Sequence, residues 1–233
     1  MITVALPNHA NPIAWLAMES LKRQRTNHDW ELIVFEDSDD PLGKEFYTSF
    51  DLGVRVVYIY QEERIALNQK WLKMMELADP SSLGIILQGS DDYSEPYRVE
   101  NAYSALTNGV DWFRTTKGMF YNIKNRRTMF FNQRTGTGLN MAISRRAIEA
   151  MPTDFKKWSG VDSWLYANLP SDAKIACDDS ENWTGGLFTD GFNRLSTSRR
   201  DMYKKPKTPF VKTGIKIDSL TLPTEIIKRL KRL

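Results

Sequence analysis

The chain has 233 residues, of which 41% are hydrophobic, 26% charged and 12% aromatic, and its net charge is +3. These values exclude collagen-like, mucin-like and wholly disordered chains, and the length is sufficient for a hydrophobic core without disulfides. The single cysteine, Cys177, excludes an intrachain disulfide and a structural zinc site, and it favours a reducing compartment such as the cytoplasm.

The charge is distributed unevenly along the chain. Residues 1–113 contain 9 Lys and Arg against 18 Asp and Glu, whereas residues 114–233 contain 23 against 11. The acidic half suits a metal ion, and the basic half suits an anionic partner or is a solvated surface. We expect no transmembrane segment, because no run approaches the roughly 20 apolar residues that a membrane span needs. The opening MITVALPNH has no basic region before an apolar stretch, so we expect no signal peptide.

Short apolar runs in the first half are typical of buried strands: Ile2–Leu6, Glu31–Phe35, Val54–Tyr60 and Leu83–Leu87. Helical patterns lie between them, after Asn11-Pro12 and over Ile65–Ala78. This alternation predicts an α/β fold with a mainly parallel sheet that is covered on both faces.

Polar clusters follow three of the predicted strands: Pro7-Asn8-His9, Glu36-Asp37 and Gly89–Tyr93. Parallel sheets bind ligands at the carboxyl ends of their strands. We therefore expect these clusters to meet at one site. His9 reads as a loop histidine, since nothing in the sequence places a base or a metal ligand beside it.

The second half is less regular. The patterns predict helices at Tyr97–Leu106, Arg145–Met151 and Val161–Leu169, and strands at Val110–Thr116, Gly118–Lys124, Thr128–Asn132 and Leu139–Ile143. Residues 199–216 are basic and read as an extended loop or tail, and Leu222–Leu233 reads as a short amphipathic helix.

Six segments, in order, resemble the motifs of GT-A fold glycosyltransferases, especially the family 2 type, over roughly residues 1–195. They are ITVALPNH, ELIVFEDSDD, RIALNQKW, LGIILQGSDDYSEP, GTGLNMAISRRAIEAM and GVDSWL. The resemblance implies a single GT-A (Rossmann-like) domain over residues 1–233. It implies a nucleotide-sugar-binding half at 1–96, an irregular acceptor-side half at 97–195, and a basic tail with a short helix at 196–233.

The resemblance also implies an enzyme: a metal-dependent, inverting glycosyltransferase with Mn²⁺ or Mg²⁺ and a nucleotide-sugar donor, most simply a UDP-sugar. The implied acceptor is a hydroxyl of a glycan or protein-linked glycan. Mn²⁺ and Mg²⁺ prefer oxygen ligands and keep waters and substrate phosphates, so one or two carboxylates suffice. An inverting transfer needs a general base for the acceptor hydroxyl.

Individual residues are assigned from the motif positions. The metal ligands are Asp91, Asp92 and Asp190, and Asp162 is the catalytic base. The donor-binding residues are Pro7, Asn8, Glu36, Asp37, Asn68, Ser90 and Asp91. Structural alternatives are an acidic turn for Asp91 and Asp92, a solvated loop for Glu36 and Asp37, and a helix cap for Asp162.

The chain departs from the family pattern at four places. Gly89 stands where the first Asp of Asp-x-Asp is usual, and Leu67 stands for the Arg of Ala-Arg-Asn. Val161 stands for the Glu of the Glu-Asp pair, and Thr189-Asp190 occupies the region of a late metal-binding His. These departures keep open a catalytically inactive binding protein on the same scaffold.

The residues also bear on three other functions. Nucleotidyl transfer would show a Gly-rich, Lys-bearing first loop, which PNHANP is not. A DNA glycosyltransferase of the phage type, acting on hydroxymethylated bases in duplex DNA, would use the basic pairs Arg126-Arg127, Arg145-Arg146, Arg199-Arg200 and Lys204-Lys205. The basic C-terminal helix would alternatively contact an anionic membrane surface.

Overall fold

The structure is a computed structural model. It describes residues 1–115, 117–122, 127–132, 141–152, 161–177, 187–190, 210–211 and 222–233. Side chains are described in residues 1–115, 141–152, 161–174 and 222–233.

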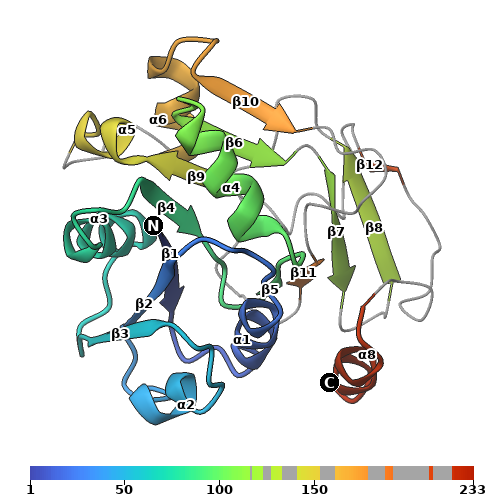
Figure 1. Ribbon diagram of the computed structural model, residues 1–233. Helices are drawn as coiled ribbons and strands as arrows, with labels where there is room; N and C mark the ends of the chain where they lie inside the picture. Colours follow the sequence, from blue (N-terminus) through green and yellow to red (C-terminus); the bar gives the residue numbers. More distant parts are fainter. Residues whose placement is uncertain are drawn as a thin grey trace.

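A seven-stranded sheet forms the centre of the fold (Figure 1). In order across the sheet, its strands are β10 (Lys174–Cys177), β6 (Trp112–Thr115), β9 (Met141–Ser144), β4 (Gly84–Leu87), β1 (Ile2–Asn8), β2 (Trp30–Glu36) and β3 (Arg55–Tyr60). β9 runs antiparallel to both neighbours, and the other strands run parallel to one another. Every residue of β1 and β4 is buried, as expected of a sheet covered on both faces. The predicted mainly parallel α/β architecture is confirmed.

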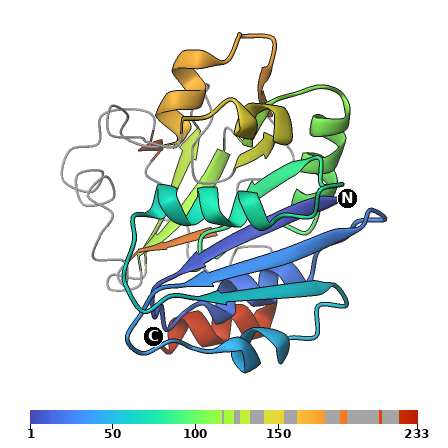
Figure 2. The same ribbon diagram turned by 90° about the vertical axis from the view of Figure 1, so that its left-hand side faces the viewer.

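Helices cover both faces of this sheet (Figure 2). The helices on one face are α3 (Leu67–Leu77), α5 (Arg145–Glu149) and α6 (Val161–Asn168). The helices on the other face are α1 (Trp15–Lys22), α2 (Lys44–Thr48) and α4 (Arg98–Thr107). Fully burying one Leu, Ile or Phe side chain stabilises the fold by about 1.5–3 kcal/mol, so the two apolar layers dominate its stability.

β4 and its antiparallel neighbour β9 approach each other closely at Gly84. A Cβ atom on Gly84 would overlap the backbone of Ile143 and would lie 2.9 Å from Leu106 Cδ1 of α4. Glycine is therefore required where β9 joins the parallel strands under α4.

A second sheet of five strands lies beside the first (Figure 1). In order, its strands are β12 (Phe210–Val211), β8 (Arg127–Asn132), β7 (Lys117–Asn122), β11 (Leu187–Asp190) and β5 (Asp92–Tyr93). β7 and β8 overlap two of the predicted strands and pair antiparallel with each other. β5 begins directly after the turn that follows β4, so this turn joins the two sheets.

The C-terminal helix α8 (Thr224–Lys231) packs against α1. Ile226 and Leu230 are buried in a cluster with Ile13, Trp15 and the strand residue Tyr93. The apolar face of α8 is thus covered by the protein itself. The predicted contact of the basic C-terminal helix with an anionic membrane surface stays a prediction, and it would use the exposed side of α8, where Lys228 and Arg229 lie. No helix in the described ranges is long and apolar enough to cross a membrane.

Candidate active site

The carboxyl ends of β1, β2 and β4 lie side by side, because the three strands are parallel neighbours. Asn8 pairs with Glu36 at the ends of β1 and β2. Beyond β4, the Gln88 N–H donates to the carbonyl oxygen of Ala5 at 2.9 Å. The polar clusters that follow these strands therefore meet at one edge of the sheet, which we call the carboxyl edge.

Glu36 is the centre of a buried network at this edge. Its carboxylate is 0% exposed and accepts five hydrogen bonds. The donors are Asn8 Nδ2 (2.8 Å), the Tyr47 hydroxyl (2.8 Å), the Tyr58 hydroxyl (2.8 Å), Leu42 N (3.2 Å) and Gly43 N (3.1 Å). Burial, together with the nearby Glu36 carboxylate, raises the pKa of both tyrosines well above the usual range. The network fixes the loop after β2, and a direct contact of Glu36 or Asn8 with a nucleotide stays a prediction.

Asp37, the next residue, forms a buried ion pair with Lys70 of α3. The second carboxylate oxygen of Asp37 accepts the Ile65 N–H at 2.9 Å, and Lys70 Nζ also donates to the carbonyl oxygen of Asn8 at 3.3 Å. His9 Nδ1 lies 2.6 Å from the Asp37 carbonyl oxygen and 3.1 Å from its carboxylate. The cluster links the loops after β1 and β2 to the start of α3.

Two features of this cluster were missed from the sequence. His9 lies in the loop after β1, as predicted, but its contact with Asp37 was missed. Lys70 is 5% exposed, and its burial lowers its pKa, an effect that the Asp37 carboxylate opposes. The available signal was spacing: Lys70 precedes the buried Met74 by four residues and so lies on the buried face of its helix.

The turn Gly89–Asp92 lies at the same edge, after β4. Asn11 Nδ2 donates to Ser90 Oγ at 3.3 Å, and the Asn11 N–H donates to Asn8 Oδ1 at 3.3 Å. Asn11 therefore connects the loop after β1 to the turn after β4. Asp91 and Asp92 are each 4% exposed.

A buried group of polar side chains supports this turn from behind. Gln88 Nε2 donates to the carbonyl oxygens of Gly89 (3.0 Å) and Asp92 (2.9 Å). Arg98 of α4 donates to Gln88 Oε1 (2.7 Å), to Ser94 Oγ (2.6 Å) and to the Leu87 carbonyl oxygen. The backbone of the turn is thereby held by the sheet and by α4.

Gly89, which replaces the first Asp of the resembled motif, leaves no room for a side chain. A Cβ atom there would overlap Asp92 Oδ2 and lie 2.8 Å from Asp92 Cγ. The Asp92 carboxylate therefore occupies the space next to position 89.

The register of β11 brings Asp190 toward the same turn. Phe188 pairs with Asp92 and Leu187 with Tyr93 in an antiparallel ladder. Asp190 is two residues beyond Phe188, in the direction in which β5 leads back to the turn. Its side chain lies outside the described residues, and among the residues described no group of three metal-ligating side chains occurs.

The remaining predicted residues lie on helices of one face and at the end of β1. Pro7 is buried in β1, and Asn68 lies half-buried in the first turn of α3. Asp162 is exposed in the first turn of α6, where its carboxylate accepts the Ser163 N–H at 2.9 Å.

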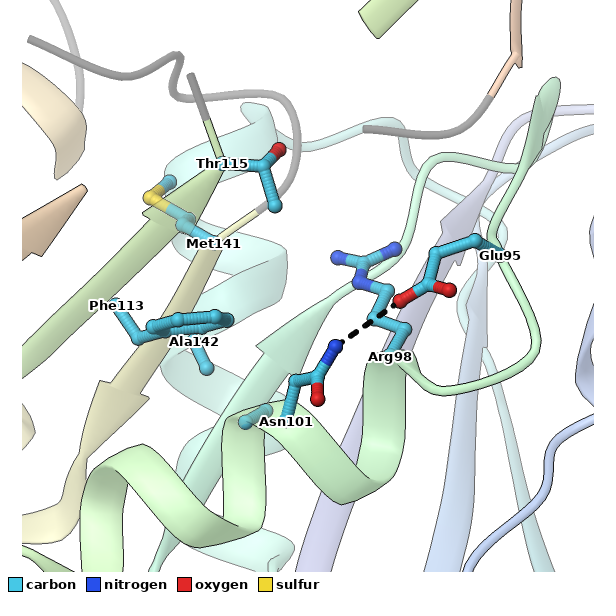
Figure 3. Close-up of a pocket in the computed structure, with 8 residues that line it drawn as sticks. Glu95, Arg98, Asn101, Phe113, Thr115, Met141 and Ala142 are labelled. Atoms are coloured by element: carbon cyan, nitrogen blue, oxygen red, sulfur yellow. Dashed lines mark hydrogen bonds between the residues drawn. The ribbon is translucent and has the colours of Figure 1, made fainter. Parts of the chain in front are cut away.

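A small pocket lies on the α4 side of the sheet, between α4, β6 and β9 (Figure 3). Arg98, Glu95 and Asn101 supply its polar atoms, and Asn101 Nδ2 donates to Glu95 Oε1 at 3.2 Å. Burial lowers the pKa of Arg98 to about 10, against the opposing charges of Asp92 and Glu95. None of the residues predicted from sequence to contact donor or metal lines this pocket.

Among the predicted basic pairs, the structure describes the side chains of Arg145-Arg146. Arg145 donates to the carbonyl oxygens of Ser82 (3.0 Å) and Asp79 (2.6 Å), and Arg146 pairs with Asp111 at 2.8 Å. These contacts lie at the amino ends of β4 and β6, the edge opposite Asp37 and Asp91. The other pairs lie outside the described side chains.

The described fold is that of GT-A glycosyltransferases. The mannosyltransferase PcManGT from Pyrobaculum calidifontis, solved with GDP-Man and Mn²⁺, is similar with a TM-score of 0.62 and 12% identity, over 87% of this chain and 60% of that one. S. aureus TarS 1-349, solved with UDP-GlcNAc, is similar with a TM-score of 0.60 and 11% identity, over 98% of this chain and 64% of that one. The expected GT-A fold is thereby shown.

This chain is shorter than the proteins that it matches. It spans 36% of a longer TarS structure and 60 to 64% of the two proteins above. No protein-family model and no curated protein matches the chain.

Proposed function

We propose that this chain is a glycosyltransferase that moves a sugar from a nucleotide-sugar donor to a hydroxyl acceptor. One observation carries the proposal: the Asp37–Lys70 pair and the Gly89–Asp92 turn, joined through Asn11, share the carboxyl edge of a GT-A sheet. Ligands of open α/β sheets bind at this edge. The single cysteine favours a cytoplasmic setting.

The donor is proposed to lie over the ends of β1 and β2. Pro7, Asn8 and Asp37 frame the nucleotide, Glu36 fixes their loops, and Asn68 and Ser90 flank the diphosphate. Lys70 holds Asp37 in place and adds positive charge beneath the donor. The complexes of similar folds with UDP-GlcNAc and GDP-Man support a nucleotide-sugar, and a UDP-sugar is the first choice.

The metal ligands proposed are Asp91, Asp92 and Asp190. The proposal is supported by the adjacent positions of Asp91 and Asp92 in the turn and by the register of β11, along which Asp190 follows Phe188 toward that turn. A bound Mn²⁺ or Mg²⁺ would act as a Lewis acid that stabilises the negative charge of the leaving diphosphate.

Asp162 is proposed as the base of an inverting transfer. It takes the proton of the acceptor hydroxyl while that oxygen bonds to the anomeric carbon and the bond to the diphosphate breaks. Its exposure in the first turn of α6 leaves its carboxylate accessible to an acceptor. A glycan or protein-linked glycan is the favoured acceptor.

The test is a thermal-shift titration of UDP, GDP and their sugars with Mn²⁺, each repeated with EDTA. A nucleotide that binds only the folded chain raises its melting temperature by mass action. Donor hydrolysis, followed by release of the nucleoside diphosphate, then measures turnover. Absence of any nucleotide response would refute the proposal.

A non-catalytic binding protein is the second candidate, and Gly89 and Val161 are the observations that favour it. It predicts a nucleotide response without donor hydrolysis or transfer. Duplex DNA containing 5-hydroxymethylpyrimidines belongs in the acceptor panel, because the basic half of the sequence would suit it.

A further inference from the structure

Arg114 is the second-last residue of β6, near the carboxyl end of a strand that runs parallel to β4. It alternates with Phe113 and so shares the sheet face of Trp112, which packs with α3, α5 and α6. Its side chain therefore lies on the face that carries Asp162. Tyr166, one helical turn after Asp162 in α6, lies near the Arg114 guanidinium.

Arg114 is buried without a counterion among the described residues. Its side chain belongs to a residue that is only 6% exposed, and its Nε is buried without a hydrogen-bond partner. Its described contact is with Trp112, whose ring centre lies 3.8 Å from the guanidinium carbon. This burial lowers the pKa of Arg114 below its ordinary value.

The two other deeply buried cations among the described residues, by contrast, have protein partners for their charge. Arg98, at 7% exposure, donates to three acceptors, and Lys70, at 5%, pairs with Asp37. A buried charge without a partner costs several kcal/mol, and an arginine does not lose its charge in proteins. A buried arginine without a protein counterion, such as Arg114, is expected where an anionic ligand supplies the opposite charge.

Carboxylates and phosphates are the ligands that a guanidinium binds best, because its parallel N–H groups match two oxygens. Lys174 lies on β10, the strand that pairs with β6, and its Nζ lies 5.2 Å from the centre of the Tyr166 ring. It therefore adds a second positive charge on the Tyr166 side of this site. Tyr166 is 58% exposed and offers an aromatic face on which a sugar ring can stack.

We propose that Arg114 receives an anionic group, a carboxylate or a phosphate, of the acceptor, so that the acceptor is an acidic or phosphorylated sugar. This inference rests on the proposed function. The acceptor is chosen over the donor because β9 separates β6 from β4, which places Arg114 about 10 Å, two strand spacings, from the strand that carries the Gly89–Asp92 turn. Tyr166 and Asp162, by contrast, lie on one helix beside it.

The experiment compares glucose, glucuronate and glucose 6-phosphate as probes in thermal-shift titrations, with and without a saturating nucleoside diphosphate. Wild-type chain should respond to one or both anionic sugars and not to glucose, and the two anions distinguish a carboxylate from a phosphate. Loss of a hydrogen-bonded charged partner should weaken the response of Arg114→Gln roughly 10- to 100-fold. Arg114→Lys should retain part of it.

Arg114→Met tests whether a lost response comes from misfolding. It keeps an apolar side chain in the buried position and removes a charge that has no ionic partner, so the fold should be preserved. It should melt at the wild-type temperature or higher and be insensitive to both anions. Arg146→Met, which removes an exposed arginine paired with Asp111, is the matched control and should keep the wild-type response to the anionic sugars.

Three outcomes would overturn the inference: no anionic response in wild type, an equal response in Arg114→Met, or a response to glucose equal to that of its anionic derivatives. Nucleotide binding is measured in the same samples, so that a failure of the Arg114 site can be told apart from a failure of the proposed glycosyltransferase function. Nucleotide binding without an anionic response refutes only the Arg114 site. An Arg114-dependent response without nucleotide binding refutes its assignment to an acceptor.

Discussion

The Asp92 carboxylate lies against Gly89, in the space that a side chain at position 89 would enter. The two positions are therefore a matched pair: the absence of a side chain at 89 allows the carboxylate at 92 to fold back over the turn. An aspartate at 89, which would restore the resembled motif, cannot be added without moving Asp92.

Gly89→Asp should therefore weaken rather than strengthen nucleotide binding in Mn²⁺. Overpacking a buried site costs about 1–3 kcal/mol, and a further carboxylate adds like-charge repulsion. Calorimetric titration of UDP with and without Mn²⁺ measures the loss. The double variant Gly89→Asp/Asp92→Gly removes the Asp92 carboxylate from the space that the new aspartate at position 89 needs. It should therefore regain nucleotide binding in Mn²⁺. Tighter binding by the single variant would contradict this account of the turn.

Lys70→Met should destabilise the fold strongly. It leaves Asp37 buried without its cation, and breaking such a pair costs about 3–5 kcal/mol. Urea unfolding measures the change, and Lys73→Met, an exposed lysine on the same helix, is the control. The double variant Lys70→Met/Asp37→Asn should recover part of the loss, because it removes the orphaned charge. Additive losses would show that the two residues do not interact.

The main sheet could be predicted because its central strands are long apolar runs. β1 and β2 were predicted within a few residues, and the polar residues after them identified the carboxyl edge. β10 and β11 were missed, and β11 owes its place to pairing with β5 and β7, which lie far from it in the sequence.

A site residue could be predicted where its chemical type and its position directly after a strand were enough to place it at the carboxyl edge. Asp37 and Asp91 follow strands, and their placement at one edge follows from parallel pairing. The partners of Asp37 were not predictable, since Lys70 and His9 lie 33 and 28 residues away in the chain and meet it only in the folded structure. Arg114 was missed for the same reason: its burial depends on α6 and on neighbouring strands.

Stability should fall steeply above pH 10. An unfolded tyrosine has a pKa of about 10, whereas burial and Glu36 raise the pKa of Tyr47 and Tyr58 in the folded chain. Above pH 10 the unfolded state therefore releases protons that the folded state keeps, so the free energy of unfolding falls as pH rises. Below pH 10 both states keep these protons, and this contribution is constant.

Urea unfolding between pH 9 and 11 measures the effect, and the slope that Tyr47 alone contributes should rise toward about 1.4 kcal/mol per pH unit as the unfolded tyrosine ionises. Tyr47→Phe loses the hydrogen bond to Glu36 and should be less stable at neutral pH, but with a shallower alkaline slope. Tyr60→Phe, at an exposed position, is the control and should leave the slope unchanged. An unchanged slope in Tyr47→Phe would contradict this origin of the alkaline sensitivity.

Asp162→Asn should abolish most turnover while leaving donor binding unchanged. The substitution is nearly isosteric, and the amide oxygen can still accept the Ser163 N–H, so α6 should keep its first turn. The amide cannot take the acceptor proton, and loss of a general base lowers turnover by roughly 10²–10⁴. Transfer rates and nucleotide affinity are measured on the same samples, with Asp172→Asn, an exposed loop aspartate, as the control. Near-normal turnover in Asp162→Asn would exclude Asp162 and assign the base to another carboxylate.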